Sequence, residues 1–142
     1  MLETKLTEEM VQFTSEAKSW EETIRIASAP LLDKGSIEPR YVEKIISNVK
    51  ELGPYIILMP NVAMPHARPE DGVNETGISL LVSKESVYFQ GEKSARIFLV
   101  LASSDATSHL ELLKEISEIL TDEEKLNELL AAKNYQDIKN LF

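Results

Sequence analysis

The sequence predicts an α/β fold: a single domain, residues 1–142, with a mixed β-sheet flanked by helices on both faces. Two short runs rich in apolar and β-branched residues, 55–58 and 96–102, are typical of buried strands. Apolar residues at helical spacing occur before, between and after these runs, an order that favours a sheet covered on both sides. The alternating segment 76–90 is typical of a hairpin, which predicts mixed strand directions. No linker or internal repeat divides the chain.

Composition narrows the class of protein. The chain has 142 residues, 43% of them hydrophobic, and no run of 18 apolar residues, so we expect no direct membrane insertion. The formal charge of −9, from 24 acidic and 15 basic residues, disfavours nucleic acid and anionic membrane as partners. No cysteine is present, which excludes disulfides, thiolate metal sites and a cysteine nucleophile. Without a secretory signal at the start, these features indicate the cytoplasm.

The first half of the chain carries clear boundary signals. Residues 10–14 alternate weakly and predict an edge strand. Ser19 and Glu22 form a capping box that opens a helix ending near Gly35, and Pro30 inside it predicts a kink or a break. Pro39 starts a second helix, which ends at Gly53.

The second half predicts strands and then helices. Residues 76–82 and 86–90 are strand-like, and 96–102 is apolar at consecutive positions, as in a central strand. A long helix should start at about Thr107, followed by shorter helices at 123–132 and 135–141. The apolar face expected for the long helix comprises Leu110, Leu113, Ile116, Ile119 and Leu120.

The segment 59–72 is the most unusual stretch of the chain. It follows the predicted strand 55–58 and contains Pro60, Pro65 and Pro69, which predicts a stiff loop without helix or ladder pairing. His66 lies in its middle. The other histidine, His109, comes 43 positions later, just past the strand 96–102. If the two strands are parallel neighbours, both histidines lie at one edge of the sheet, where ligands bind in open α/β folds.

Familiar catalytic motifs are missing around these histidines. Two histidines without cysteine or helical His-x-x-x-His spacing disfavour a metal site, so we expect no metal. The chain has no Gly-x-Ser-x-Gly elbow, P-loop or dinucleotide fingerprint, and we expect no cofactor. Histidine itself remains as the reacting group, because a neutral imidazole is a good nucleophile near pH 7. We therefore interpret His66 as a nucleophile that is transiently phosphorylated.

A phosphorylated histidine needs groups that stabilise an added charge of about −1.5 to −2. His109, Thr107 and Ser108 stand at a predicted helix start, where free amides and the helix dipole attract anions. Arg68 adds a fixed positive charge two residues past His66.

Plainer interpretations exist for the same residues. A loop histidine is usually a surface residue, and His109 has the position of an ordinary polar residue at a helix start. Arg68 is equally explained as a solvated charge or as a partner of Glu70 or Asp71.

The loop also resembles a known active-site signature. Residues 64–73, Met-Pro-His-Ala-Arg-Pro-Glu-Asp-Gly-Val, followed by Asn-Glu-Thr-Gly, are similar to enzyme IIA components of the bacterial sugar phosphotransferase system, mannitol/fructose-type superfamily. The similarity extends upstream through Ile-Glu-Pro-Arg-Tyr at 37–41 and Gly-Pro-Tyr at 53–55, and downstream through Asp-Ala-x-x-His at 105–109. Within the superfamily the loop is most similar to L-ascorbate-type members.

The resemblance implies a mechanism and partners. His66 would accept a phosphoryl group from phospho-HPr on Nε2 and pass it to a cysteine of the cognate enzyme IIB, for uptake of L-ascorbate through the membrane enzyme IIC. His109 would hydrogen-bond the phosphoryl group. Mannitol-type relatives carry an arginine on the second helix where Asn48 stands here, so either Arg68 or Lys50 supplies that charge or backbone amides suffice. The alternatives are a IIA for another sugar or sugar alcohol, a regulatory module with a non-transport partner, and a structural domain with an incidental histidine.

Overall fold

The computed structural model describes residues 2–105, 107 and 110–142. Its centre is a five-stranded mixed sheet with the strand order β1-β4-β5-β3-β2. Strand β1 runs parallel to β4, and β3 runs parallel to β5, whereas the pairs β4–β5 and β2–β3 are antiparallel. The predicted mixed sheet is confirmed. The strands are β1 (Val11–Thr14), β2 (Ile57–Met59), β3 (Asn61–Ala63), β4 (Gly77–Tyr88) and β5 (Ser94–Ala102).

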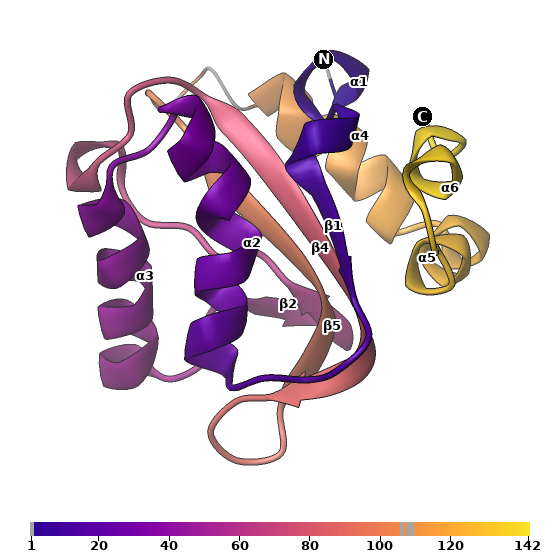
Figure 1. Ribbon diagram of the computed structural model, residues 1–142, viewed down its shortest axis with the longest axis horizontal. Helices are drawn as coiled ribbons and strands as arrows, with labels where there is room; N and C mark the ends of the chain where they lie inside the picture. Colours follow the sequence, from indigo (N-terminus) through magenta and orange to yellow (C-terminus); the bar gives the residue numbers. More distant parts are fainter. Residues whose placement is uncertain (1, 106, 108–109) are drawn as a thin grey trace.

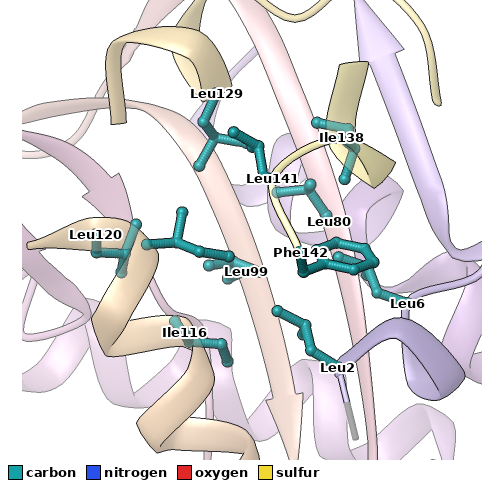
Figure 2. Close-up of a pocket in the computed structure, with 11 residues that line it drawn as sticks. Leu2, Leu6, Leu80, Leu99, Ile116, Leu120, Leu129, Ile138, Leu141 and Phe142 are labelled. Atoms are coloured by element: carbon teal, nitrogen blue, oxygen red, sulfur yellow. The ribbon is translucent and has the colours of Figure 1, made fainter. Parts of the chain in front are cut away.

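Helices cover both faces of this sheet, as predicted (Figure 1). On one side, the Ser79 hydroxyl of β4 donates a 2.6 Å hydrogen bond to the Ala27 carbonyl of α2. The next residue of β4, Leu80, points to the opposite side with its cross-strand partner Leu99, into an apolar cluster built by the C-terminal helices (Figure 2). One face carries α2 (Trp20–Lys34) and α3 (Pro39–Leu52), and the other carries α1 (Leu2–Lys5), α4 (Leu110–Leu120), α5 (Glu123–Leu130) and α6 (Tyr135–Lys139).

The cap signals of the first long helix are confirmed. The Ser19 side chain accepts from the Glu22 N–H at 3.2 Å, and Gly35 ends α2 at a φ of 80°. Pro30 does not break α2. A proline has no N–H to donate to the carbonyl four residues earlier, but here that carbonyl has a different donor. This carbonyl belongs to Ile26, and it accepts a 2.6 Å hydrogen bond from the Gln12 side chain of β1.

The prediction that the segment 59–72 lacks ladder pairing is wrong for Met59 and for Asn61–Ala63. Pro60 and Pro65 flank β3 but do not lie in it, so Asn61–Ala63 keep the N–H groups needed to pair with β5. The predicted buried strand 55–58 is shifted to Ile57–Met59 and lies at the sheet edge. The strand before His66 is therefore β3, a parallel neighbour of β5. The same segment also holds a short 3₁₀ helix, Pro69–Asp71.

The predicted hairpin within residues 76–90 is also wrong, because the segment forms one long strand, β4. An irregularity between Val82 and Val87 interrupts its register with β5 but not its direction. The reversal comes later, at a turn that contains Gly91 with a φ of 79°. The residues that separate the two predicted strands, Ser83, Lys84 and Glu85, lie inside β4.

The C-terminal helices are shorter than predicted, and the inward face of α4 is rotated. Leu110 is 58% exposed, while Leu112, which the predicted face omitted, is fully buried beside Ile116 and Ile119. Helix α5 ends at Leu130 and α6 at Lys139. The described part of α4 begins at Leu110, so the predicted start near Thr107 falls partly on undescribed residues. Within the described ranges, no helix is long and apolar enough to cross a membrane.

Candidate functional site

The His66 side chain is held in one tautomer by its own loop. It lies three residues past β3, and its ring is half-buried. The ring Nδ1 lies 2.7 Å from the Met64 carbonyl oxygen. A carbonyl only accepts hydrogen bonds, so Nδ1 is the protonated nitrogen of the neutral ring, and Nε2 then keeps its lone pair. The geometry therefore leaves Nε2 as the ring nitrogen available to a partner.

One backbone hydrogen bond and the Tyr41 hydroxyl connect this loop to the end of β5. The Leu101 N–H donates to the Pro65 carbonyl at 3.1 Å. The Tyr41 hydroxyl of α3 donates to the Leu101 carbonyl at 2.7 Å and accepts from the Ala67 N–H at 3.0 Å. Burial raises the pKa of Tyr41 to about 12, against the opposing hydrogen bond with Ala67, so the hydroxyl stays protonated and keeps its donor. His66 thus lies between Pro65, which is hydrogen-bonded directly to Leu101 of β5, and Ala67, which is connected to Leu101 through the Tyr41 hydroxyl.

A second tyrosine contacts His66 itself. The Tyr55 hydroxyl donates to the His66 carbonyl at 2.9 Å, and the two rings meet nearly at right angles, 77°, with centroids 5.7 Å apart. Partial burial raises the pKa of Tyr55, and a side-chain hydrogen bond with Asn48 opposes the rise. The predicted phosphate candidate Asn48 lies on α3, close enough to Tyr55 to lower the pKa of that phenol.

A hydrogen bond between the Arg68 backbone and the Asp71 side chain stabilises the loop after His66. The Arg68 N–H donates to the Asp71 carboxylate at 3.0 Å, which caps the 3₁₀ helix. In the described part of the chain, the exposed Arg68 guanidinium takes part in no ion pair. Asp71 thus accepts a hydrogen bond from the Arg68 backbone N–H and does not pair with the Arg68 guanidinium. The Arg68 guanidinium remains available to an anion at the surface.

The predicted helix-start residues are described only in part. Thr107 lies past the end of β5, and its N–H and hydroxyl both donate to the Asp105 carboxylate, at 2.9 Å and 3.1 Å. Both Thr107 donors are therefore occupied in this state. The other two candidates, Ser108 and His109, lie outside the described residues. Across the ranges that are described, no three His, Asp or Glu side chains gather as a metal site would require.

The two tyrosines that support the histidine loop lie in segments that carry the family resemblance, 37–41 and 53–55, but sequence reasoning assigns neither of them a role. Tyr41 interrupts the otherwise aliphatic inward face of α3, with Val42 and Ile45 beside it. A buried phenol needs a hydrogen-bond partner, which was the available signal. Tyr55 follows the Gly-Pro turn after α3, and no periodicity marks a contact with a residue eleven positions later.

Comparison with known proteins assigns this arrangement to a class of phosphotransferase components. Residues 4–142 match the family "Phosphoenolpyruvate-dependent sugar phosphotransferase system, EIIA 2". The chain is 38% identical over 135 residues to the mannitol-specific cryptic phosphotransferase enzyme IIA component of Escherichia coli, which covers 94% of this chain and 92% of the relative. It is 34% identical over 134 residues to the ascorbate-specific PTS system EIIA component of the same species, with coverages of 92% and 87%.

Solved structures agree with the sequence relatives. The solution structure of the E. coli cryptic mannitol enzyme IIA superposes with a TM-score of 0.91 at 37% identity, covering 99% of this chain and 96% of that one. The complex of E. coli mannitol enzyme IIA with phosphorylated enzyme IIB contains a chain similar at a TM-score of 0.82 and 27% identity, with coverages of 96% and 96%.

The protein belongs to the EIIA 2 family of the phosphoenolpyruvate-dependent sugar phosphotransferase system. Components of this family are phosphotransferases that carry a phosphohistidine. They receive the phosphoryl group from HPr and pass it to an enzyme IIB component. The resemblance found in the histidine loop and the α/β fold that it implied are both confirmed.

Proposed function

We propose that His66 is the phosphoryl-carrying residue of this IIA component and that Nε2 is the acceptor atom. The observation that carries the proposal is the 2.7 Å contact between Nδ1 and the Met64 carbonyl, which leaves the Nε2 lone pair free. In the first step a P–N bond forms at Nε2 while the phosphorus–donor bond of phospho-HPr breaks. In the second step that P–N bond breaks as phosphorus bonds to the cysteine sulfur of enzyme IIB. Nδ1 keeps its proton throughout, so the imidazole leaves each transfer in its starting tautomer.

The phosphoryl charge is stabilised by groups around the loop. His109 donates a hydrogen bond to a phosphoryl oxygen, with Ser108 beside it in the sequence. Arg68 is the candidate for a fixed charge, because its guanidinium is exposed and its backbone is held two residues from His66. Thr107 contributes only if its donors leave Asp105. Asn48 of α3, which lowers the pKa of Tyr55, is the remaining candidate.

The substrate of the parent transporter is L-ascorbate in our proposal. The loop with Pro65, His66, Arg68, Pro69 and Gly72 supports it through its similarity to ascorbate-type members. Mannitol or another sugar alcohol is the second candidate, since identity to the cryptic mannitol component is higher, 38% against 34%. In either case residues 1–142 act as one cytoplasmic domain, coupled to membrane enzyme IIC only through enzyme IIB.

Phosphorylation with purified components tests the assignment of His66. Wild-type protein incubated with labelled phosphoenolpyruvate, enzyme I and HPr should acquire one acid-labile label. His66→Ala should acquire none and should melt at the wild-type temperature, because a half-buried loop side chain contributes little to the core. Undiminished labelling of His66→Ala would show that another residue carries the phosphoryl group.

Transfer to enzyme IIB tests the substrate. Labelled protein should pass its phosphoryl group fastest to an ascorbate-type IIB when mannitol-type and ascorbate-type IIB proteins are offered at equal concentration. Faster transfer to the mannitol-type protein would favour the sugar alcohol. The presence of label on His66 is independent of either result.

A further inference from the structure

We propose that Tyr55 is a positioning residue for His66: its hydroxyl and its ring together fix the orientation of the imidazole. The inference deepens the proposed function and rests on His66 as the phosphoryl carrier. It assigns a role to Tyr55, which lies in the α3–β2 connection, a part of the chain that supplies no nucleophile.

Tyr55 contacts both the backbone and the ring of His66. Its hydroxyl donates to the His66 carbonyl at 2.9 Å, and its ring packs against the imidazole at 77° and 5.7 Å, the perpendicular arrangement that aromatic pairs favour. The Nδ1 contact with Met64 fixes only one edge of the imidazole. With Tyr55 added, His66 is held at its Nδ1, at its carbonyl and through its ring. Three contacts define where Nε2 points.

Tyr55 is itself held in place by a tight turn. The Tyr55 N–H donates to the Gly53 carbonyl at 2.7 Å, and the Ile57 N–H donates to the Pro54 carbonyl at 3.1 Å. Pro54 restricts its own φ and limits the conformations of the residue before it. Gly53 has a φ of 84°, which suits glycine. The Tyr55 ring therefore projects from a rigid corner at the end of α3.

Because Tyr55 is partly exposed, a positioning role for its side chain can be tested separately from a role in the stability of the fold. Tyr55 is 37% exposed, whereas Tyr41, the other tyrosine bonded to this loop, is fully buried. Replacing Tyr55 should therefore disturb His66 without unfolding the protein. Tyr88 offers a matched control, because it is 63% exposed and lies in β4, paired with Ser94 at the start of β5.

The first test compares Tyr55→Phe and Tyr55→Leu with Tyr88→Phe and Tyr88→Leu. One neutral hydrogen bond corresponds to about a 2- to 12-fold change in rate, so transfer from phospho-HPr to Tyr55→Phe should slow by about that factor. Tyr55→Leu loses the ring contact as well and should be about 5- to 160-fold slower. Both Tyr88 variants should stay within twofold of wild type. Tyr55 variants that transfer as fast as wild type would overturn the proposal.

Imidazole ¹⁵N NMR of the unphosphorylated protein provides a readout that does not depend on phosphoryl transfer. Wild type should show His66 as a single Nδ1–H tautomer, and Tyr55→Leu should shift the ring signals toward a mixture of tautomers. Unchanged ring signals together with an unchanged melting temperature would reject a positioning role. If wild-type protein is not labelled on His66, the proposed function fails, whereas this NMR comparison still tests the contact.

Discussion

Replacing Tyr41 by phenylalanine should loosen the histidine loop and cost measurable stability. The substitution keeps the buried ring but removes the hydroxyl that donates to the Leu101 carbonyl at 2.7 Å and accepts from the Ala67 N–H at 3.0 Å. A buried polar group left without a partner costs about 1–3 kcal/mol, and the less buried Ala67 N–H should lie at the low end of that range. We therefore expect the free energy of unfolding to fall by roughly 2–4 kcal/mol.

Thermal unfolding is the direct assay. At about 2.1 cal/mol/K of unfolding entropy per residue, a loss of 2–4 kcal/mol in a chain of 142 residues lowers the melting temperature by roughly 7–13 °C. Native-state hydrogen exchange should also become faster at the Ala67 amide. Tyr88→Phe, at an exposed tyrosine, should change the free energy by less than about 0.5 kcal/mol. If Tyr41→Phe has the wild-type melting temperature and the wild-type exchange rate at the Ala67 amide, the Tyr41 hydroxyl does not stabilise the histidine loop and the reasoning is refuted.

Three further predictions concern pH, backbone strain and rate. Burial raises the pKa of Tyr41 to about 12 from an ordinary value near 10, so its contribution is intact below pH 10 and is lost as pH rises toward 12. Urea titrations should show wild type losing about 1.4 kcal/mol per pH unit more than Tyr41→Phe across that interval, and parallel curves would contradict the buried neutral phenol. Gly72→Ala should lower the free energy of unfolding by about 1–3 kcal/mol, because Gly72 has a φ of 134° and a Cβ there would lie 3.2 Å from the Tyr41 Cβ. Gly91→Ala, with a φ of 79° and open space, is its control, and an equal or larger loss there would reject the steric part of the argument. His109→Ala should still be labelled but transfer about 10²–10³-fold more slowly in rapid-quench assays, and an unchanged rate would remove His109 from the site.

The parts of the fold that local chemistry determines were predictable from the sequence. The Ser19 cap, the Gly35 and Gly53 helix ends and the Pro39 start each depend on one residue and its backbone geometry. The buried run that became β5 was recognisable because a central strand is apolar on both faces. These signals act over a few residues, and the structure retains them.

Features that depend on distant partners were not predictable. Pro30 is tolerated because Gln12, on another element, bonds the Ile26 carbonyl. Strand β3 forms between two prolines because β5 supplies its ladder, and nothing within the segment shows this. The polar residues Lys84 and Glu85 are exposed within β4, and the sequence does not show that the strand continues through them.

The proposed nucleophile of the site could be predicted from the sequence, whereas the residues that hold it in place could not. His66 stood out because it is one of two histidines and lies among prolines. Its tautomer depends on a backbone carbonyl two residues away, which the sequence does not specify. Tyr41 and Tyr55 come from elements folded against the loop, so only the tertiary structure reveals that they bond it.

The position of phosphorus on the imidazole tests the central claim most directly. Imidazole ¹⁵N and ³¹P NMR of the phosphorylated protein should place phosphorus on Nε2 of His66 and a retained proton on Nδ1, bonded to the Met64 carbonyl. Phosphorus on Nδ1, or on any residue other than His66, would contradict the account.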